Sequence, residues 1–261
     1  MESLTYRGST SDFFRFSSGI IVKSPMRVWA GNPNQQKLEE EMEKAISFEQ
    51  QVLEKLGDHP RIVPYLGPHS SSRGIKLSEA SHGNLQAYID SGVPIDNSLR
   101  WKWSLQAVEA VVYVHHKGVI HSDLRPENYL VHTTKKGSLD LWLCDFGGAR
   151  CDSVGLNVSH LPDEPFFDPR MPWNSTSAVD IFSLGSMIYT ILTGHWPYRE
   201  GPPPVTVEDK SVYEAYVNGM FTAGRFPDVS WLKGGTVIMK CWNHQYSTAE
   251  EVLLQLTALV N

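Results

Sequence analysis

The stretch HSDLRPEN (residues 121–128) is followed, after an apolar segment, by CDFG (residues 144–147). The segment between them contains the turn sequence TTKKGS and then LDLWLC, where leucines alternate with other residues, so it predicts a β-hairpin. The two ends of an antiparallel hairpin lie side by side, and we therefore expect Asn128 and Asp145 to meet. Asp123 adds a carboxylate from the same loop as Asn128. Oxygen ligands of this kind suit Mg²⁺ better than zinc.

The composition limits the classes of protein that fit this chain. It has 261 residues, of which 41% are hydrophobic and 20% are charged, so it suits one large domain or two lobes around a cleft. Its net charge of −6 gives no basic surplus for nucleic acid. No apolar run is long enough to span a membrane. The 3 cysteines have spacings unlike a metal site, and we expect reduced thiols in a cytoplasmic protein.

The first part of the chain is rich in strand signals. Residues 6–25 combine short apolar runs with Gly/Ser turns, and residues 58–67 and 74–80 predict two more strands. Between them, residues 35–57 have apolar positions at helical spacing and end in a glycine, which predicts one long helix.

The second part of the chain is mainly helical. The segment AVDIFSLGSMIYTILTG (residues 178–194) is apolar nearly all round, which predicts a helix buried in the middle of the larger part. We therefore predict an α+β fold with two lobes, residues 1–80 and residues 81–261, that share a cleft.

These motifs resemble, in their order and spacing, those of the eukaryotic protein kinase family. HSDLRPEN and CDFG resemble its catalytic loop and its metal-binding motif. Further resemblances lie in HPRIVPYLG, DIFSLG, ILTGHWPY and KCWNHQYSTAEEV, so that nearly the whole chain is covered. The resemblance implies a bilobal protein-kinase-like fold, in a divergent branch, with a small strand-rich N-lobe that has one long helix and a larger, mainly helical C-lobe.

The resemblance also implies roles for the polar loop, with ATP and Mg²⁺ as cofactors. Asp123 would accept the proton of a substrate hydroxyl, and Asn128 and Asp145 would hold Mg²⁺. Arg125, in place of the usual Lys, would counter charge on the transferred phosphoryl group. The alternative for Asp123 is a turn residue that caps its own backbone; the flanking His121, Asn128 and DFG argue against it.

One carboxylate of the long helix lies on its apolar face. Glu49 falls between Ala45 and Val52 on that face, and a carboxylate turned toward the core needs a cation. Lys23 lies in GIIVKSP, where the family carries its phosphate-binding Lys, and we predict a Lys23–Glu49 ion pair. The alternative is a solvated Lys23 and a Glu49 at the rim of the helix.

The nucleotide-binding strands are the least typical part. Gly8 has no second glycine in the usual place, although Gly8 and Ser9 could offer backbone N–H groups to phosphates. A tight surface turn would have the same sequence. By alignment with the family, Leu77 would border the adenine pocket, and Glu79 and Ala80 would belong to the hinge.

Two further departures concern the activation segment. Ser122 stands where the family usually has an Arg that receives a phosphate, so we expect activity without phosphorylation of Ser153 or Ser159. FFDPR (residues 166–170) replaces the usual Ala-Pro-Glu, and residues 241–252 contain no Arg to pair with it. Both halves of a buried ion pair are expected to be missing together, which can be nearly neutral for stability.

These features predict an ATP- and Mg²⁺-dependent protein kinase that acts on a protein hydroxyl, more on Ser or Thr than on Tyr because of the PEN sequence. The alternative is a non-catalytic pseudokinase that scaffolds partners, which the sparse glycines and Ser122 favour. A small-molecule kinase of related fold is a third hypothesis. The expected partners are ATP and a protein substrate of unknown identity, without nucleic acid or membrane, and the chain is expected to be a monomer.

Overall fold

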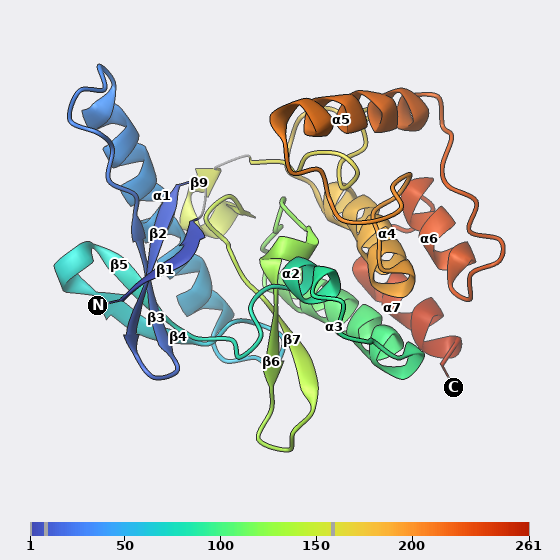
Figure 1. Cartoon of the computed structure of the whole chain (residues 1–261), viewed down its shortest axis with the longest axis horizontal. Coiled ribbons are helices and arrows are strands. Elements are labelled where there is room, and N and C mark those ends of the chain that lie inside the picture. The colour runs from blue at the N-terminus through green and yellow to red at the C-terminus, as the bar shows by residue number, and fades with distance from the viewer. Residues whose placement is uncertain (1, 8–9, 158–159, 261) are drawn as a thin grey trace.

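The computed structural model describes residues 2–7, 10–157 and 160–260, and it has two lobes (Figure 1). A strand-rich lobe with one long helix comes first in the chain, and a mainly helical lobe follows. The predicted α+β architecture is therefore confirmed. Among the described residues, no helix is both long and apolar enough to cross a membrane.

The small lobe is built on a five-stranded sheet with the order β1-β2-β3-β5-β4. All of its neighbouring strands are antiparallel. The strands are β1 (Glu2–Arg7), β2 (Ser11–Ser17), β3 (Ile20–Pro25), β4 (Tyr65–His69) and β5 (Gly74–Ser78), with a short 3-10 turn η1 (Ser70–Ser72) between the last two. In β2 and β3, Phe13 is opposite Lys23 and Arg15 is opposite Ile21. Opposed residues share a face of the sheet, so these four side chains point the same way.

The long helix α1 (Gln35–Leu56) packs beside this sheet (Figure 1). Its buried face consists of apolar side chains and a single carboxylate, that of Glu49. The helix ends where Gly57 takes a positive φ of 66°, a conformation that glycine adopts without steric cost.

The large lobe surrounds one central helix, α4 (Ser177–Thr193), in which every residue from Val179 to Ile191 is buried. Its other helices are α2 (Leu85–Asp90), α3 (Asn97–His116), α5 (Val207–Thr222), α6 (Gly235–Trp242) and α7 (Ala249–Ala258). Short elements complete it: η2 (Pro126–Asn128), β8 (Arg150–Cys151), η3 (Asp152–Val154) and β9 (Leu156–Asn157). The all-round apolar pattern thus correctly indicated a helix in the middle of the lobe.

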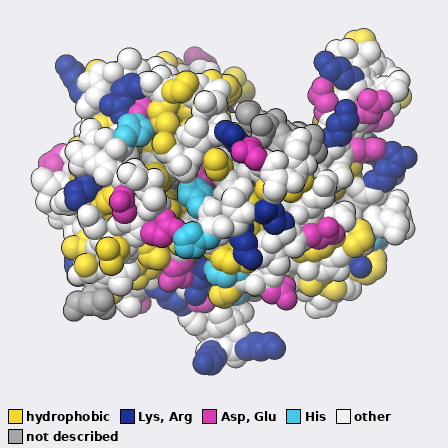
Figure 2. Space-filling view, turned by 180° about the vertical axis from the view of Figure 1, so that it is seen from behind, with side chains coloured by type: hydrophobic (Ala, Val, Ile, Leu, Met, Phe, Trp, Pro, Cys, Tyr) yellow, Lys and Arg dark blue, Asp and Glu magenta, His cyan; other side chains and the backbone are white. Residues whose placement is uncertain are grey.

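The predicted hairpin is confirmed as β6 (Tyr129–Thr133) and β7 (Leu139–Leu143). The Cys144 N–H donates to the Asn128 carbonyl over 2.9 Å, which brings together the two ends of the hairpin. The second strand also bonds to the small lobe, because the Leu143 N–H donates to the Arg61 carbonyl over 2.7 Å. From behind, the turn of the hairpin projects from the body, and positive and negative side chains are interspersed over this face (Figure 2).

Two mid-helix glycines should respond oppositely to the same substitution. A Cβ atom at Gly185 in α4 would lie 2.9 Å from Cβ of buried Cys241 and 3.0 Å from Cδ1 of buried Trp242. At exposed Gly219 in α5 a Cβ atom would meet nothing within 4 Å. We expect Gly185→Ala to lower the free energy of unfolding by about 1–3 kcal/mol through overpacking. Gly219→Ala should raise it by up to about 1 kcal/mol. Urea unfolding measures both, and equal effects would contradict the close α4–α6 contact.

Candidate active site

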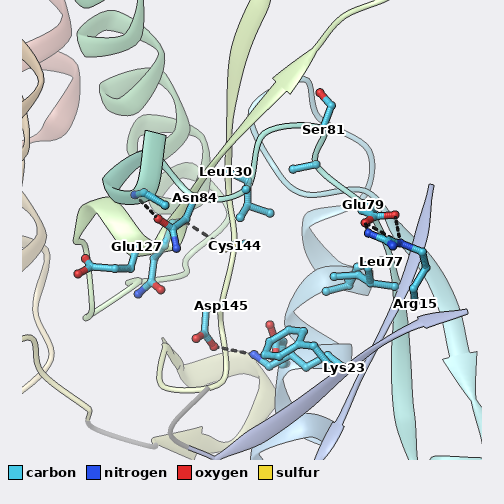
Figure 3. Close-up of a pocket in the computed structure, with 17 residues that line it drawn as sticks. Arg15, Lys23, Leu77, Glu79, Ser81, Asn84, Glu127, Leu130, Cys144 and Asp145 are labelled. Carbon is cyan, nitrogen blue, oxygen red and sulfur yellow. Dashed lines mark hydrogen bonds and ion pairs between the residues drawn. The ribbon is translucent and has the colours of Figure 1, made fainter. Parts of the chain in front are cut away.

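The cleft between the lobes contains a cavity of about 450 Å³ (Figure 3), a size typical of small-molecule sites. It is lined by seven of the residues that the sequence singled out: Lys23, Glu49, Leu77, Glu79, Ala80, Asn128 and Asp145. A smaller adjoining cavity of about 140 Å³ shares Lys23, Glu49 and Asp145 and adds Asp123. Gly8 and Ser9 lie outside the described residues.

A buried ammonium group joins the two lobes at this site. Lys23 Nζ lies 2.7 Å from Glu49 Oε2 and 2.7 Å from Asp145 Oδ1, so the ion pair expected between Lys23 and Glu49 is present. Burial alone would lower the pKa of Lys23, but the Asp145 and Glu49 carboxylates outweigh burial and raise it. Burial would likewise raise the pKa of Asp145, and Lys23 holds it below its usual value. Both groups are therefore charged at neutral pH.

The catalytic-loop residues are fixed by Asp180, a buried carboxylate in the first turn of α4. It accepts the backbone N–H groups of His121 over 2.8 Å and Ser122 over 2.9 Å, and it lies 2.8 Å from His115 Nε2. Ser122 has a φ of 69°, a strained conformation for a non-glycine residue that such contacts can hold in place. The sequence reasoning missed Asp180, whose signal was a single Asp inside an apolar helix.

Asp123 lines the smaller cavity, and its carboxylate is only partly hydrogen-bonded. The Asn128 Nδ2 group donates to the Asp123 carbonyl over 2.8 Å and to Oδ2 over 3.0 Å. Within the described part of the chain, Asp123 Oδ1 is buried and has no hydrogen-bond partner. Burial raises the pKa of the Asp123 carboxyl. An unpartnered carboxylate oxygen in a cavity is placed to accept a proton or a hydrogen bond from a ligand.

Arg125 does not line either of these two cavities. Its guanidinium donates to Glu127 through Nε over 3.0 Å and through Nη2 over 3.2 Å, and Nη1 lies 3.9 Å from Asp163 Oδ2. Burial would lower the pKa of Arg125, but Glu127 raises it. Glu127 lines the larger cavity, so it connects Arg125 to that cavity. The sequence reasoning did not identify this partner.

The donors available to a metal are few. Among the described residues, no group of three or more His, Cys, Asp or Glu side chains could hold an ion. Asn128 and Asp145 both line the larger cavity and offer an amide oxygen and a carboxylate. Mg²⁺ is commonly held by one or two carboxylates together with substrate phosphates and water. These two residues therefore fit Mg²⁺ only when phosphate oxygens of a bound ligand complete the coordination of the ion.

The end of the activation segment corrects one expectation. Asp168, in FFDPR, is fully buried and forms an ion pair with Arg170 over 2.7 Å, and it also lies 2.7 Å from His244 Nε2. Arg170 Nη2 further donates to the Trp242 carbonyl over 2.9 Å. The prediction that both halves of the buried ion pair are missing is therefore wrong. Asp168 supplies the carboxylate. Arg170, two residues later in the chain, supplies the cation, instead of an arginine from residues 241–252.

Comparison with known proteins agrees with this geometry. The family model of the protein kinase domain matches residues 30–218, and Lys23 precedes the matched range. A probable serine/threonine-protein kinase, zyg-1 of Caenorhabditis briggsae, is 32% identical over 46% of this chain and 17% of its own length. Cell division control protein 7 of Schizosaccharomyces pombe is 30% identical over 60% of this chain and 15% of its own length. The matched stretches are thus only a small part of these two relatives.

The Asp168 cluster predicts a defined acid response. Burial alone would raise the pKa of Asp168, but hydrogen bonds from His244 and Arg170 lower it to about 2. A carboxyl whose folded pKa is depressed stabilises the fold above its unfolded pKa, here by about 2 kcal/mol, and loses that contribution as the pH falls. We expect about half of it to be lost between pH 5 and pH 3.

Urea unfolding of wild type and Asp168→Asn at both pH values measures this response. The variant should show a pH dependence that is shallower by about 1 kcal/mol over this range. Parallel pH profiles for the two proteins would contradict the assigned role of Asp168.

Proposed function

The chain belongs to the protein kinase family, and from that premise we propose that it transfers the γ-phosphoryl group of ATP to a protein hydroxyl, more readily on Ser or Thr than on Tyr. One observation carries the proposal. Lys23 is paired with Glu49 and Asp145 at 2.7 Å each, in a cavity that Asn128 also lines. Asp123, whose Oδ1 has no hydrogen-bond partner among the described residues, lines the adjoining cavity. These are the residue types that phosphoryl transfer from ATP requires.

Each side chain has a role that follows from its surroundings. Asp123 orients the substrate hydroxyl and accepts its proton at Oδ1, the oxygen that Asn128 leaves unpaired. Lys23 binds phosphate oxygens, and Glu49 fixes the position of its ammonium group. Asn128 and Asp145 would hold Mg²⁺, which supplies charge neutralisation at the phosphates when bound.

Arg125 is a cation that lines neither of the two cavities. Two hydrogen bonds to Glu127, in the same loop, orient its planar guanidinium group. We propose that it offsets negative charge on the transferred phosphoryl group or on the bound substrate. The Ser/Thr preference is supported by the PEN sequence and by the similarity to zyg-1, a probable serine/threonine-protein kinase.

A non-catalytic role remains the second candidate, and one observation favours it. The family match begins at residue 30, so Lys23 and residues 6–16, whose single glycine is Gly8, lie outside it. A scaffold protein with this fold would need the buried contacts of Asp180 and Asp168, but it would not need to bind nucleotide tightly. Cytoplasmic location and the monomeric state stay predictions.

Asp123→Asn tests the transfer reaction. We expect radiolabel transfer from ATP with Mg²⁺ to a protein acceptor to fall about 10²–10⁴-fold, because the substrate hydroxyl loses its proton acceptor. Asp228→Asn is a matched control, since Asp228 is an exposed aspartate of the large lobe that lines neither cavity. Equal labelling by wild type and Asp123→Asn would end the enzyme proposal.

Thermal shift with ATP and Mg²⁺, compared in wild type and Lys23→Met, separates the two candidates. Stabilisation of wild type that is lost in Lys23→Met supports nucleotide binding at this cavity. No stabilisation of wild type would favour the scaffold.

Activity should not depend on phosphorylation of the activation segment. The backbone at Ser122 is held by Asp180, so the catalytic loop is ordered without a phosphate. A cation does lie next to Ser153, because Lys55 Nζ donates to Ser153 Oγ over 2.8 Å. Exposed contacts of this kind contribute little to stability.

We expect the Ser153→Ala, Ser159→Ala double variant to keep the wild-type transfer rate within about twofold, because exposed ionic contacts are weak. Phosphatase-treated wild type serves as the comparison. A large loss in both samples would refute independence from phosphorylation.

A further inference from the structure

We propose that Arg15 is a positioning residue of the nucleotide site, which holds the first part of the interlobe connection against the small lobe through Glu79. This confines the flexible point between the lobes to Ala80. The part of the proposal that concerns nucleotide rests on the proposed function.

The ion pair lies at one side of the larger cavity and joins Arg15 of β2 to Glu79, which directly follows β5 (Figure 3). Arg15 Nε donates to Glu79 Oε1 over 3.0 Å and to Oε2 over 3.1 Å, and Nη2 lies 2.5 Å from Oε1. The Arg15 and Glu79 side chains are 42% and 23% exposed. Contact of the guanidinium with both carboxylate oxygens is more directional than a single ionic contact.

On the small-lobe side, Glu79 is also held through its backbone. Its N–H donates to the Gly19 carbonyl over 2.9 Å, in the turn between β2 and β3. The preceding residue, Ser78, donates its N–H to the Pro64 carbonyl over 3.0 Å. Glu79 therefore has two attachments to the same hairpin, one from the backbone to Gly19 and one from the carboxylate to Arg15.

On the large-lobe side, the connection is bonded to β6 from Ser81 onward. The Thr133 N–H donates to Ser81 Oγ over 2.8 Å, the His82 N–H donates to the Val131 carbonyl over 3.0 Å, and the Val131 N–H donates to the Gly83 carbonyl over 2.8 Å. These bonds make the segment part of the large lobe.

Ala80 is left between the two sets of attachments. Its backbone N–H has no hydrogen bond to any other residue that the structure describes, and Ala80 lines the larger cavity. Its freedom to move is set by how firmly Glu79 is held. The Arg15 ion pair doubles the attachments of Glu79 to the small lobe, and it also neutralises a carboxylate next to a cavity that would receive an anionic nucleotide.

Loss of Arg15 should therefore weaken nucleotide binding without unfolding the lobe. An exposed ion pair contributes about 0–1 kcal/mol to stability, so Arg15→Ala should fold. We expect its dissociation constant for a fluorescent ADP analogue with Mg²⁺ to rise about threefold, because a preformed site is lost and an unpaired carboxylate remains. The charge-swapped double variant Arg15→Glu, Glu79→Arg should recover most of the affinity, which a purely steric role of Arg15 would not predict.

Hydrogen–deuterium exchange of the free protein provides a readout that needs no nucleotide. In Arg15→Ala the hydrogen-bonded amides of Ser78 and Glu79 should exchange about threefold faster, in line with the loss of a weak ion pair. Arg73→Ala is the matched control, because it removes another Arg–Glu pair of the small lobe, with Glu43, that does not line this cavity. It should change neither measurement.

The two proposals fail in distinguishable ways. If wild type binds no nucleotide, the proposed function fails, and the exchange data alone decide the role of Arg15. If Arg15→Ala and Arg73→Ala exchange equally at Ser78 and Glu79, the positioning role is overturned whatever the nucleotide data show. If exchange accelerates but the dissociation constant does not change, the link between Arg15 and the nucleotide is overturned.

Discussion

The structure of the cleft depends on one buried ammonium group. Lys23 lies between Glu49 and Asp145, each 2.7 Å from its Nζ, and the three residues come from a strand, a helix and the end of a hairpin. Breaking a buried pair by removing one partner costs roughly 3–5 kcal/mol, because a charge is left uncompensated. A movement of α1 away from the sheet would separate Glu49 from its cation, so the charge cluster opposes such a rearrangement.

A second buried charge fixes the other wall of the site independently. Asp180 holds the loop before Asp123 from inside the large lobe, and it uses backbone N–H groups to do so. Asn128 links the two parts of the site that these charges hold. Its side chain donates to Asp123, and its carbonyl accepts the Cys144 N–H. The distance between Asp123 and Lys23 is therefore set by two buried charges and one amide.

The sequence was sufficient to predict features that follow from the spacing of apolar residues or from neighbours in the chain. The alternating leucines predicted the hairpin that brings Asn128 and Asp145 together, and the apolar stripe of the long helix predicted that Glu49 would need a cation. It was insufficient where the partner of a charge is decided by tertiary packing. The contacts of Asp180 with the loop and the pair between Arg15 and Glu79 join residues far apart in the chain, and no pattern around either residue specifies its partner.

The pairing of arginines in this chain explains how it differs from the family pattern that its motifs resemble. Three arginines each bond to a carboxylate two residues away: Arg125 to Glu127, Arg150 to Asp152 and Arg170 to Asp168. A pair this close in sequence needs little ordering of the chain, because the two side chains start near each other. It also satisfies each cation within its own segment. These three cations therefore do not require a phosphate for their neutralisation.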